Sequence, residues 1–115
     1  MEAKELAKLV ITALEDKKAE DIKVIDISDV SVIADYFIIA NGSSKTQVHA
    51  LANNVDEICG RAGYPVKQME GYESASWILM DFGDVIVHVF SKEDRLFYDL
   101  ERIWRDGKII DVNEL

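Results

Sequence analysis

The fold is decided by the stretch Trp77-Ile-Leu-Met-Asp-Phe-Gly-Asp-Val-Ile-Val-His-Val-Phe90. Its centre is Gly83-Asp84, a dipeptide that readily takes the positive φ angles of a tight two-residue turn, and an apolar run lies on each side of it. The pattern predicts a β-hairpin. Folding the chain about the turn pairs six apolar residues on one face, namely Phe82 with Val85, Met80 with Val87, and Ile78 with Val89. We interpret this face, called the core face below, as part of the hydrophobic core.

The opposite face of the hairpin has a mixed chemistry. A face that only fills a core rarely includes an aspartate, and a face that only meets water rarely combines tryptophan with phenylalanine. Here Asp81 and His88 are diagonal neighbours that could pair with each other. We therefore interpret this second side as a partner-binding surface, called the recognition face below. Its members are Trp77, Leu79 and Asp81, opposite Phe90, His88 and Ile86.

Length and composition favour one ordinary globular domain spanning residues 1–115. A chain of 115 residues with 49% hydrophobic and 30% charged residues can bury a core without disulfides or metals. The single cysteine, Cys59, excludes an internal disulfide and is predicted to be buried on a helix. No run approaches the ~18 apolar residues of a membrane span, and the first residues do not resemble a signal peptide. We expect a cytoplasmic protein.

The charge balance bears on the class of partner. With 22 acidic and 13 basic residues, the net charge is −9, so phosphate backbones would repel the chain at long range. No basic stripe with interleaved aromatic residues is present, which disfavours direct binding to DNA or RNA. A basic protein partner suits this charge better. The plain alternative is that the negative charge only keeps the protein in solution.

The rest of the chain predicts further helices and strands. Apolar residues at helical spacing predict a helix over residues 2 to about 17, and β-forming runs predict strands at 22–27, 35–40 and 65–69. Pro65 places the last of these at or near an edge of the sheet. Ser44-x-x-Gln47 matches a capping box, so a second helix begins at Ser43 or Ser44 and ends at Gly63.

A third helix is predicted after the hairpin, between Ser91 and Gly107, because Ser91-x-x-Asp94 is a capping signal. On this helix Tyr98 points away from the apolar side, which makes it a candidate contact residue, although surface tyrosines without a role are common. The tail 108–115 is expected to pack through Ile109 and Ile110. The element order α-β-β-α-β-β-β-α predicts an α+β fold, a mixed β-sheet of about five strands with helices mainly on one layer.

Motifs for catalysis are weak. Asn41-Gly-Ser-Ser-Lys45 precedes a helix N-terminus, where Ser43 and Ser44 could hold an anion, but the spacing of a phosphate-binding loop is absent. A nucleotide-binding or nucleotidyltransferase-type enzyme remains an alternative, although Asp81 and Asp84 lack the spacing of paired magnesium ligands on one strand. His49 and His88 have no second ligand at metal spacing. The residues favour a small acidic binding module without a metal or cofactor.

Several motifs resemble the ribosomal silencing factor (Iojap-like) family. The resemblance extends from about Ile22 to Trp104, and the Trp77–Phe90 hairpin is its most specific part. The other motifs are Asp35-Tyr-Phe-Ile-Ile-Ala-Asn-Gly-Ser-Ser44, Gln47-Val-x-Ala50, Glu70-Gly71 and Arg95-x-Phe-Tyr-x-Leu-Glu101.

The resemblance implies a nucleotidyltransferase-like fold that lacks the catalytic carboxylates, and a non-enzymatic function. It implies binding to the large ribosomal subunit through ribosomal protein fourteen at the intersubunit face. There the protein would block joining of the small subunit and repress translation when nutrients are short. The resemblance also implies a homodimer. The family's surface positions match Trp77, Leu79, Asp81, His88, Phe90 and Tyr98.

Overall fold

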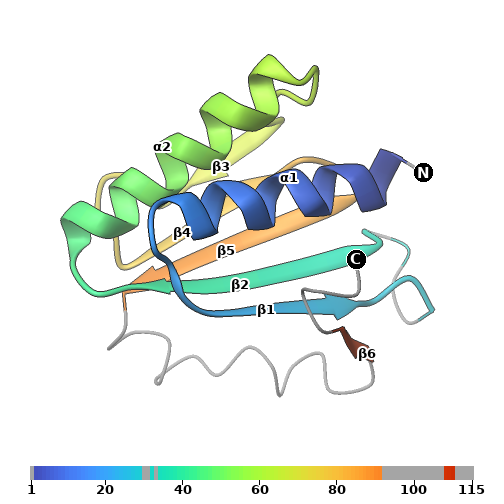
Figure 1. Cartoon of the computed structure of the whole chain (residues 1–115), viewed down its shortest axis with the longest axis horizontal. Coiled ribbons are helices and arrows are strands. Elements are labelled where there is room, and N and C mark those ends of the chain that lie inside the picture. The colour runs from blue at the N-terminus through green and yellow to red at the C-terminus, as the bar shows by residue number, and fades with distance from the viewer. Residues whose placement is uncertain (1, 30–31, 33, 92–107, 111–115) are drawn as a thin grey trace.

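The computed structural model of the chain describes residues 2–29, 32, 34–91 and 108–110 (Figure 1). Two helices and six strands lie in this part of the chain. Their order is α1 (Glu2–Asp16), β1 (Glu20–Asp26), β2 (Tyr36–Gly42), α2 (Lys45–Arg61), β3 (Gln68–Glu70), β4 (Trp77–Asp81), β5 (Val85–Ser91) and β6 (Lys108–Ile110). The predicted third helix and Tyr98 fall outside the described residues.

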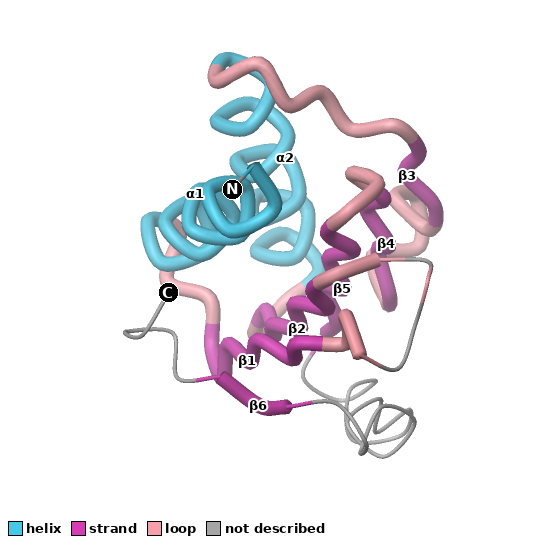
Figure 2. The backbone as a smooth tube through the Cα atoms, turned by 90° about the vertical axis from the view of Figure 1, so that its right-hand side faces the viewer, coloured by secondary structure: helices cyan, strands magenta, loops and turns pink. Residues whose placement is uncertain are grey.

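The strands form one mixed sheet in the order β3-β4-β5-β2-β1-β6. β2 and β5 are parallel, and the other neighbouring pairs are antiparallel. Both described helices lie on the same side of this sheet (Figures 1 and 2). The predicted α+β fold with helices on one layer is therefore confirmed. The strand predicted over 65–69 is Gln68–Glu70 (β3); it lies at an edge of the described sheet as expected, but Pro65 is outside it. The nucleotidyltransferase-like character of the fold stays a prediction.

The sheet has one strand more than the predicted number of about five. Lys108–Ile110, expected to be a packed tail, forms β6 and pairs antiparallel with β1, with Val24 opposite Ile110. Three residues are too few to show the alternation by which a strand is recognised in a sequence. β2 also runs on through Asn41 and Gly42, where we expected the strand to stop. Glycine fits there because a Cβ on Gly42 would lie 2.8 Å from a methyl group of Val48.

The predicted cap of α2 is present with one difference. The Ser44 hydroxyl accepts a hydrogen bond from the backbone N–H of Gln47 at 3.1 Å, as a capping box requires. The Gln47 side-chain oxygen, however, accepts from the backbone N–H and hydroxyl of Ser43, one residue before the cap. The side-chain nitrogen of Gln47 also donates to the carbonyl groups of Lys17 and Lys18, at 3.2 and 3.0 Å. Gln47 thus joins the start of α2 to the end of α1.

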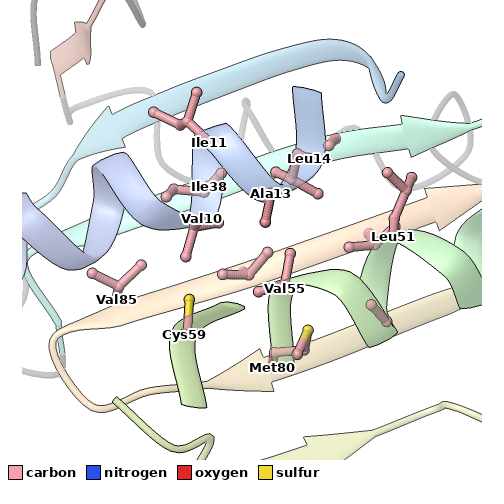
Figure 3. Close-up of a cluster of buried hydrophobic side chains, with 14 of the residues drawn as sticks. Val10, Ile11, Ala13, Leu14, Ile38, Leu51, Val55, Cys59, Met80 and Val85 are labelled. Atoms are coloured by element: carbon pink, nitrogen blue, oxygen red, sulfur yellow. The ribbon is translucent and has the colours of Figure 1, made fainter. Parts of the chain in front are cut away.

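The main hydrophobic core fills the space between the helices and the sheet (Figure 3). α1 contributes Val10 and Leu14 to it, and α2 contributes Leu51 and Val55. All six residues of the core face are buried here; Phe82 is 6% exposed and the other five are fully buried. Cys59 lies in the same core, and its burial raises the pKa of the thiol to about 11. The core face and the buried cysteine are both confirmed.

The hairpin has the predicted register. Phe82 N–H donates to the Val85 carbonyl at 3.0 Å across the turn, where Gly83 has a φ of +96°. The carbonyl of Asp84 accepts hydrogen bonds from the N–H groups of Asp35 and Tyr36, at 2.8 and 3.1 Å, which holds the turn against the start of β2. Along the strands the pairs are Trp77 with Phe90, Ile78 with Val89, Leu79 with His88, Met80 with Val87, and Asp81 with Ile86.

Candidate functional site

A second apolar cluster lies on the side of the sheet opposite the helices. It is built from strand residues of β1, β2 and β5 with two residues of the loop between β1 and β2, and Trp77 and Ile86 pack against it. Its buried members are Ile25, Ile27, Ala34, Phe37, Ile39 and Phe90. The recognition face of the hairpin therefore continues into a buried apolar region that the hairpin sequence alone does not reveal.

The recognition face is only partly accessible. Trp77, Leu79, Asp81 and Ile86 are half-buried. His88, by contrast, is 3% exposed and Phe90 is fully buried. The expectation that this whole side stays accessible is right for the first four residues and wrong for His88 and Phe90. Phe90 belongs to the second apolar cluster, and the ring of His88 lies against Phe37 of that cluster, whereas Ile86 of the same strand only packs at its margin.

Trp77 is held in place by two of its neighbours on β5. Its indole Nε1–H donates a hydrogen bond to Nδ1 of His88 at 2.8 Å. Its ring stacks on Phe90, with the ring centroids 5.3 Å apart and an angle of 20° between the planes. These contacts fix a large aromatic side chain at the boundary between buried and accessible parts of the sheet.

The backbone before Trp77 is equally constrained. Gly71 has a φ of +78°, and a Cβ at this position would lie 2.1 Å from the carbonyl oxygen of Trp77. The Ser76 carbonyl accepts a hydrogen bond from the N–H of Ser91 at 3.0 Å, beyond the last Trp77–Phe90 pair. The loop that joins β3 to β4 therefore packs Gly71 closely against the Trp77 carbonyl, and only glycine allows this contact.

His88 is neutral and pairs with Trp77 rather than with Asp81. Burial lowers the pKa of His88 to about 3, so the imidazole carries no charge at neutral pH. Its Nδ1 accepts from Trp77, and its buried Nε2 has no hydrogen-bond partner among the described residues. Asp81 instead uses Oδ1 to accept a hydrogen bond from the N–H of Gly83 at 2.8 Å. The predicted pair of Asp81 with His88 is therefore wrong, because each side chain has a nearer partner.

The structure adds polar neighbours that our reading of the sequence did not include. Gln68 and Glu70 of β3 lie opposite Asp81 and Leu79, and both are exposed. The Gln68 amide donates to the Glu70 carboxylate at 3.0 Å. Predicting them would have required the register of β3 with β4, and a strand of three residues next to a loop does not define its register in the sequence. Together with Asp81, they give the accessible apolar residues a polar margin on the side of β3.

Other kinds of site find little support in the described part of the chain. No group of three or more His, Cys, Asp or Glu side chains that could hold a metal ion occurs among the described residues. At Ser43 and Ser44, the N–H of Ser43 already donates to Gln47, and the N–H of Gln47 already donates to Ser44. Within the same residues, neither helix has the length and apolar character required to cross a membrane.

Comparison with known proteins shows the family. The family model described as "Ribosomal silencing factor during starvation" matches residues 1–115 of this chain. The chain belongs to the ribosomal silencing factor family. A ribosomal silencing factor from Bacillus subtilis is 42% identical over 113 residues, which cover 98% of this chain and 96% of the relative. The predicted family is confirmed, and ribosome silencing is its general function.

Solved structures agree with the fold. A crystal structure of a Chromobacterium violaceum protein has a TM-score of 0.88 and 44% identity, covering 90% of this chain and 87% of that one. A crystal structure from Bacillus halodurans has a TM-score of 0.84 and 39% identity, covering 94% and 98%. The curated relative from Bacillus subtilis is named as a silencing factor and not as an enzyme.

Proposed function

We propose that this ribosomal silencing factor binds the large ribosomal subunit through ribosomal protein fourteen, using the recognition face of the β4–β5 hairpin. Bound there, the protein blocks joining of the small subunit by its bulk and represses translation when nutrients are short. The observation that carries the proposal is the half-buried Trp77, which is fixed by His88 and Phe90. Rigid aromatic anchors of this kind, surrounded by polar groups, dominate the binding energy of protein interfaces.

The remaining accessible residues support the same use. Leu79 and Ile86 add apolar area beside the indole, and Asp81 and Glu70 add carboxylates at the margin. A net charge of −9 would speed the encounter with a basic ribosomal protein. We include Tyr98 in the proposed surface on the family resemblance alone. His88 and Phe90 contribute from beneath the surface.

The proposed mechanism requires no catalytic step, metal or cofactor. Occupation of the intersubunit face by a folded domain excludes the small subunit by steric overlap. The proposal also includes a cytoplasmic location and a homodimer. An alternative use of the recognition face is burial within that dimer.

The deciding experiment is replacement of Trp77. We expect Trp77→Ala to weaken binding to purified large subunits by on the order of 2 kcal/mol, because truncation removes the anchor of the interface. Pelleting of the protein with large subunits over a concentration series measures this loss. Tyr72→Ala is a suitable control, since Tyr72 is an exposed aromatic residue whose ring and hydroxyl contact His49 and Asn53 of α2, on the helix side of the sheet.

The stability of both variants should be measured alongside binding, because Trp77→Ala also leaves Nδ1 of His88 without its donor. Folded Trp77→Ala that binds large subunits as the wild type does would remove Trp77 from the site. Light scattering of the same variant tests the alternative. A change in mass would assign the recognition face to self-association.

A further inference from the structure

The hydrogen bond between Trp77 and His88 determines the state of the histidine. An indole nitrogen only donates, so Nδ1 of His88, at 2.8 Å from Nε1 of Trp77, must be the acceptor. The ring proton of the neutral imidazole therefore lies on Nε2. That atom is buried and has no hydrogen-bond partner in the part of the chain that the structure describes.

The surroundings of His88 leave it no direct contact with a partner. The side chain is 3% exposed, and its ring centroid lies 4.1 Å from that of Phe37 and 6.2 Å from that of Phe90. A buried N–H without an acceptor destabilises a fold, and leucine or phenylalanine would fill this place without that penalty. The histidine is therefore best explained by its other nitrogen, the one that holds Trp77.

We propose that His88 is a positioning residue for the ribosome-binding surface: through Nδ1 it fixes the indole of Trp77 in the orientation that the large subunit recognises. This inference rests on the proposed function, because it concerns the same surface. It changes the role of His88 from a contact residue, as the sequence indicated, to a support beneath the contact.

The same hydrogen bond limits what the partner can recognise on Trp77. The indole has a single N–H group, and this group is used within the sheet. The partner therefore meets the ring atoms of Trp77 and does not accept a hydrogen bond from it. Fixing the ring in advance also removes the entropy loss of ordering it when the complex forms.

Two substitutions separate positioning from packing. His88→Leu keeps a side chain of similar size but removes the acceptor, whereas His88→Asn places an amide oxygen near the position of Nδ1. The first readout is the ¹⁵N–¹H resonance of the Trp77 indole in the free protein, with the indole of Trp104, the second tryptophan of the chain, as internal reference. We expect this resonance to move in His88→Leu and to stay near the wild-type position in His88→Asn.

The second readout is affinity for purified large subunits. We expect His88→Leu to bind about tenfold more weakly than the wild type, and His88→Asn to recover most of that loss. A third readout needs no variant: ¹⁵N spectra of the wild-type imidazole should show the proton on Nε2. Finding it on Nδ1 would overturn the proposal whether or not the variants fold.

The outcomes distinguish this proposal from the proposed function. If Trp77→Ala binds weakly but folded His88→Leu binds as the wild type does, only the role of His88 is overturned. If Trp77→Ala itself binds normally, the proposed surface fails and the positioning role fails with it. An indole resonance unmoved in His88→Leu would also overturn the role, since it would show that Nδ1 does not hold the ring.

Discussion

Two residues of the recognition face, Trp77 and His88, contribute in different ways although both lie on one side of one hairpin. Trp77 lies on β4, next to the edge strand β3, and is half-buried. His88 lies on β5, inside the sheet, and is covered. An alternating sequence shows which residues share a face, but it does not show how far each lies from the edge of the sheet. The alternation alone therefore cannot separate the anchor, Trp77, from its support, His88.

The burial of His88 predicts a pH dependence of stability. The pKa of His88 is about 3 in the folded protein, below the ordinary value of 6.5 that we expect in the unfolded chain. Below pH 6.5 the unfolded state therefore binds a proton that the folded state does not, and stability falls as the pH drops toward 3. Between pH 7 and pH 5 we expect a loss of about 2 kcal/mol from this group. Urea unfolding at both pH values measures it.

The matched control for the pH dependence is His88→Phe, which keeps a ring at this position but cannot titrate. Its stability should change less than that of the wild type between the same two pH values. Equal losses in both proteins would mean that carboxylates elsewhere, and not His88, set the acid sensitivity.

At the level of elements, the hairpin is the part of the fold that the sequence predicts best. Its two-residue turn, its register and its core face are as expected, because six apolar residues alternate without a break; of the turn dipeptide, however, Gly83 takes a positive φ and Asp84 does not. The same reasoning fails for β6 and for the register of β3, since neither strand has enough residues to show a period. It also fails at the end of β2, where Asn41-Gly42 looks like a stop but stays paired to Phe90 and Ser91.

The two faces of the hairpin predict opposite responses to a charge. Ile78→Asp places a carboxylate in the fully buried core and should cost about 4 kcal/mol or more, enough to unfold a small domain. Leu79→Asp, one residue away on the half-buried side, should cost about 1 kcal/mol. Circular dichroism and urea unfolding of the two variants provide the comparison. An unfolded Leu79→Asp with a folded Ile78→Asp would reverse the assignment of the faces.

The loop before β4 contains a glycine, Gly71, whose replacement should destabilise the protein. Gly71→Ala should destabilise the protein by at least about 1 kcal/mol, because φ is +78° and the new Cβ would meet the Trp77 carbonyl oxygen. Gly60→Ala is the matched control: Gly60 lies in α2 with none of the described residues within 4 Å of the added carbon, so the change should stabilise the helix by about 0.5–1 kcal/mol. Thermal unfolding of both variants tests the contrast. Similar melting temperatures would show that the loop tolerates a changed path into Trp77.

For the molecule as a whole, the fold gives the sheet two different sides. The helices cover one side completely enough to bury every residue of the core face (Figure 2). On the other side, Phe90 and His88 are buried, but Trp77, Leu79 and Asp81 of β4 and Ile86 of β5 are only half-buried. The sequence predicted which hairpin residues lie on this side, Trp77 among them. It could not predict the gradient of burial across it, because burial depends on strands and segments far from the hairpin in sequence.

The excess of acidic residues predicts that salt slows binding to the large subunit. Attraction between a chain of net charge −9 and a basic partner raises the association rate, and ions screen it over about 10 Å at 0.1 M. We expect the association rate to fall roughly tenfold between ~50 and ~300 mM salt, with little change in the dissociation rate.

Glu70→Lys, beside the recognition face, should slow association more than Glu15→Lys, an exposed change of equal charge on α1. Stopped-flow measurements with labelled protein follow both rates. An association rate that does not change with salt, or equal effects of the two variants, would contradict the prediction. The acidic residues near Trp77 would then not guide the encounter, and their function would be confined to solubility.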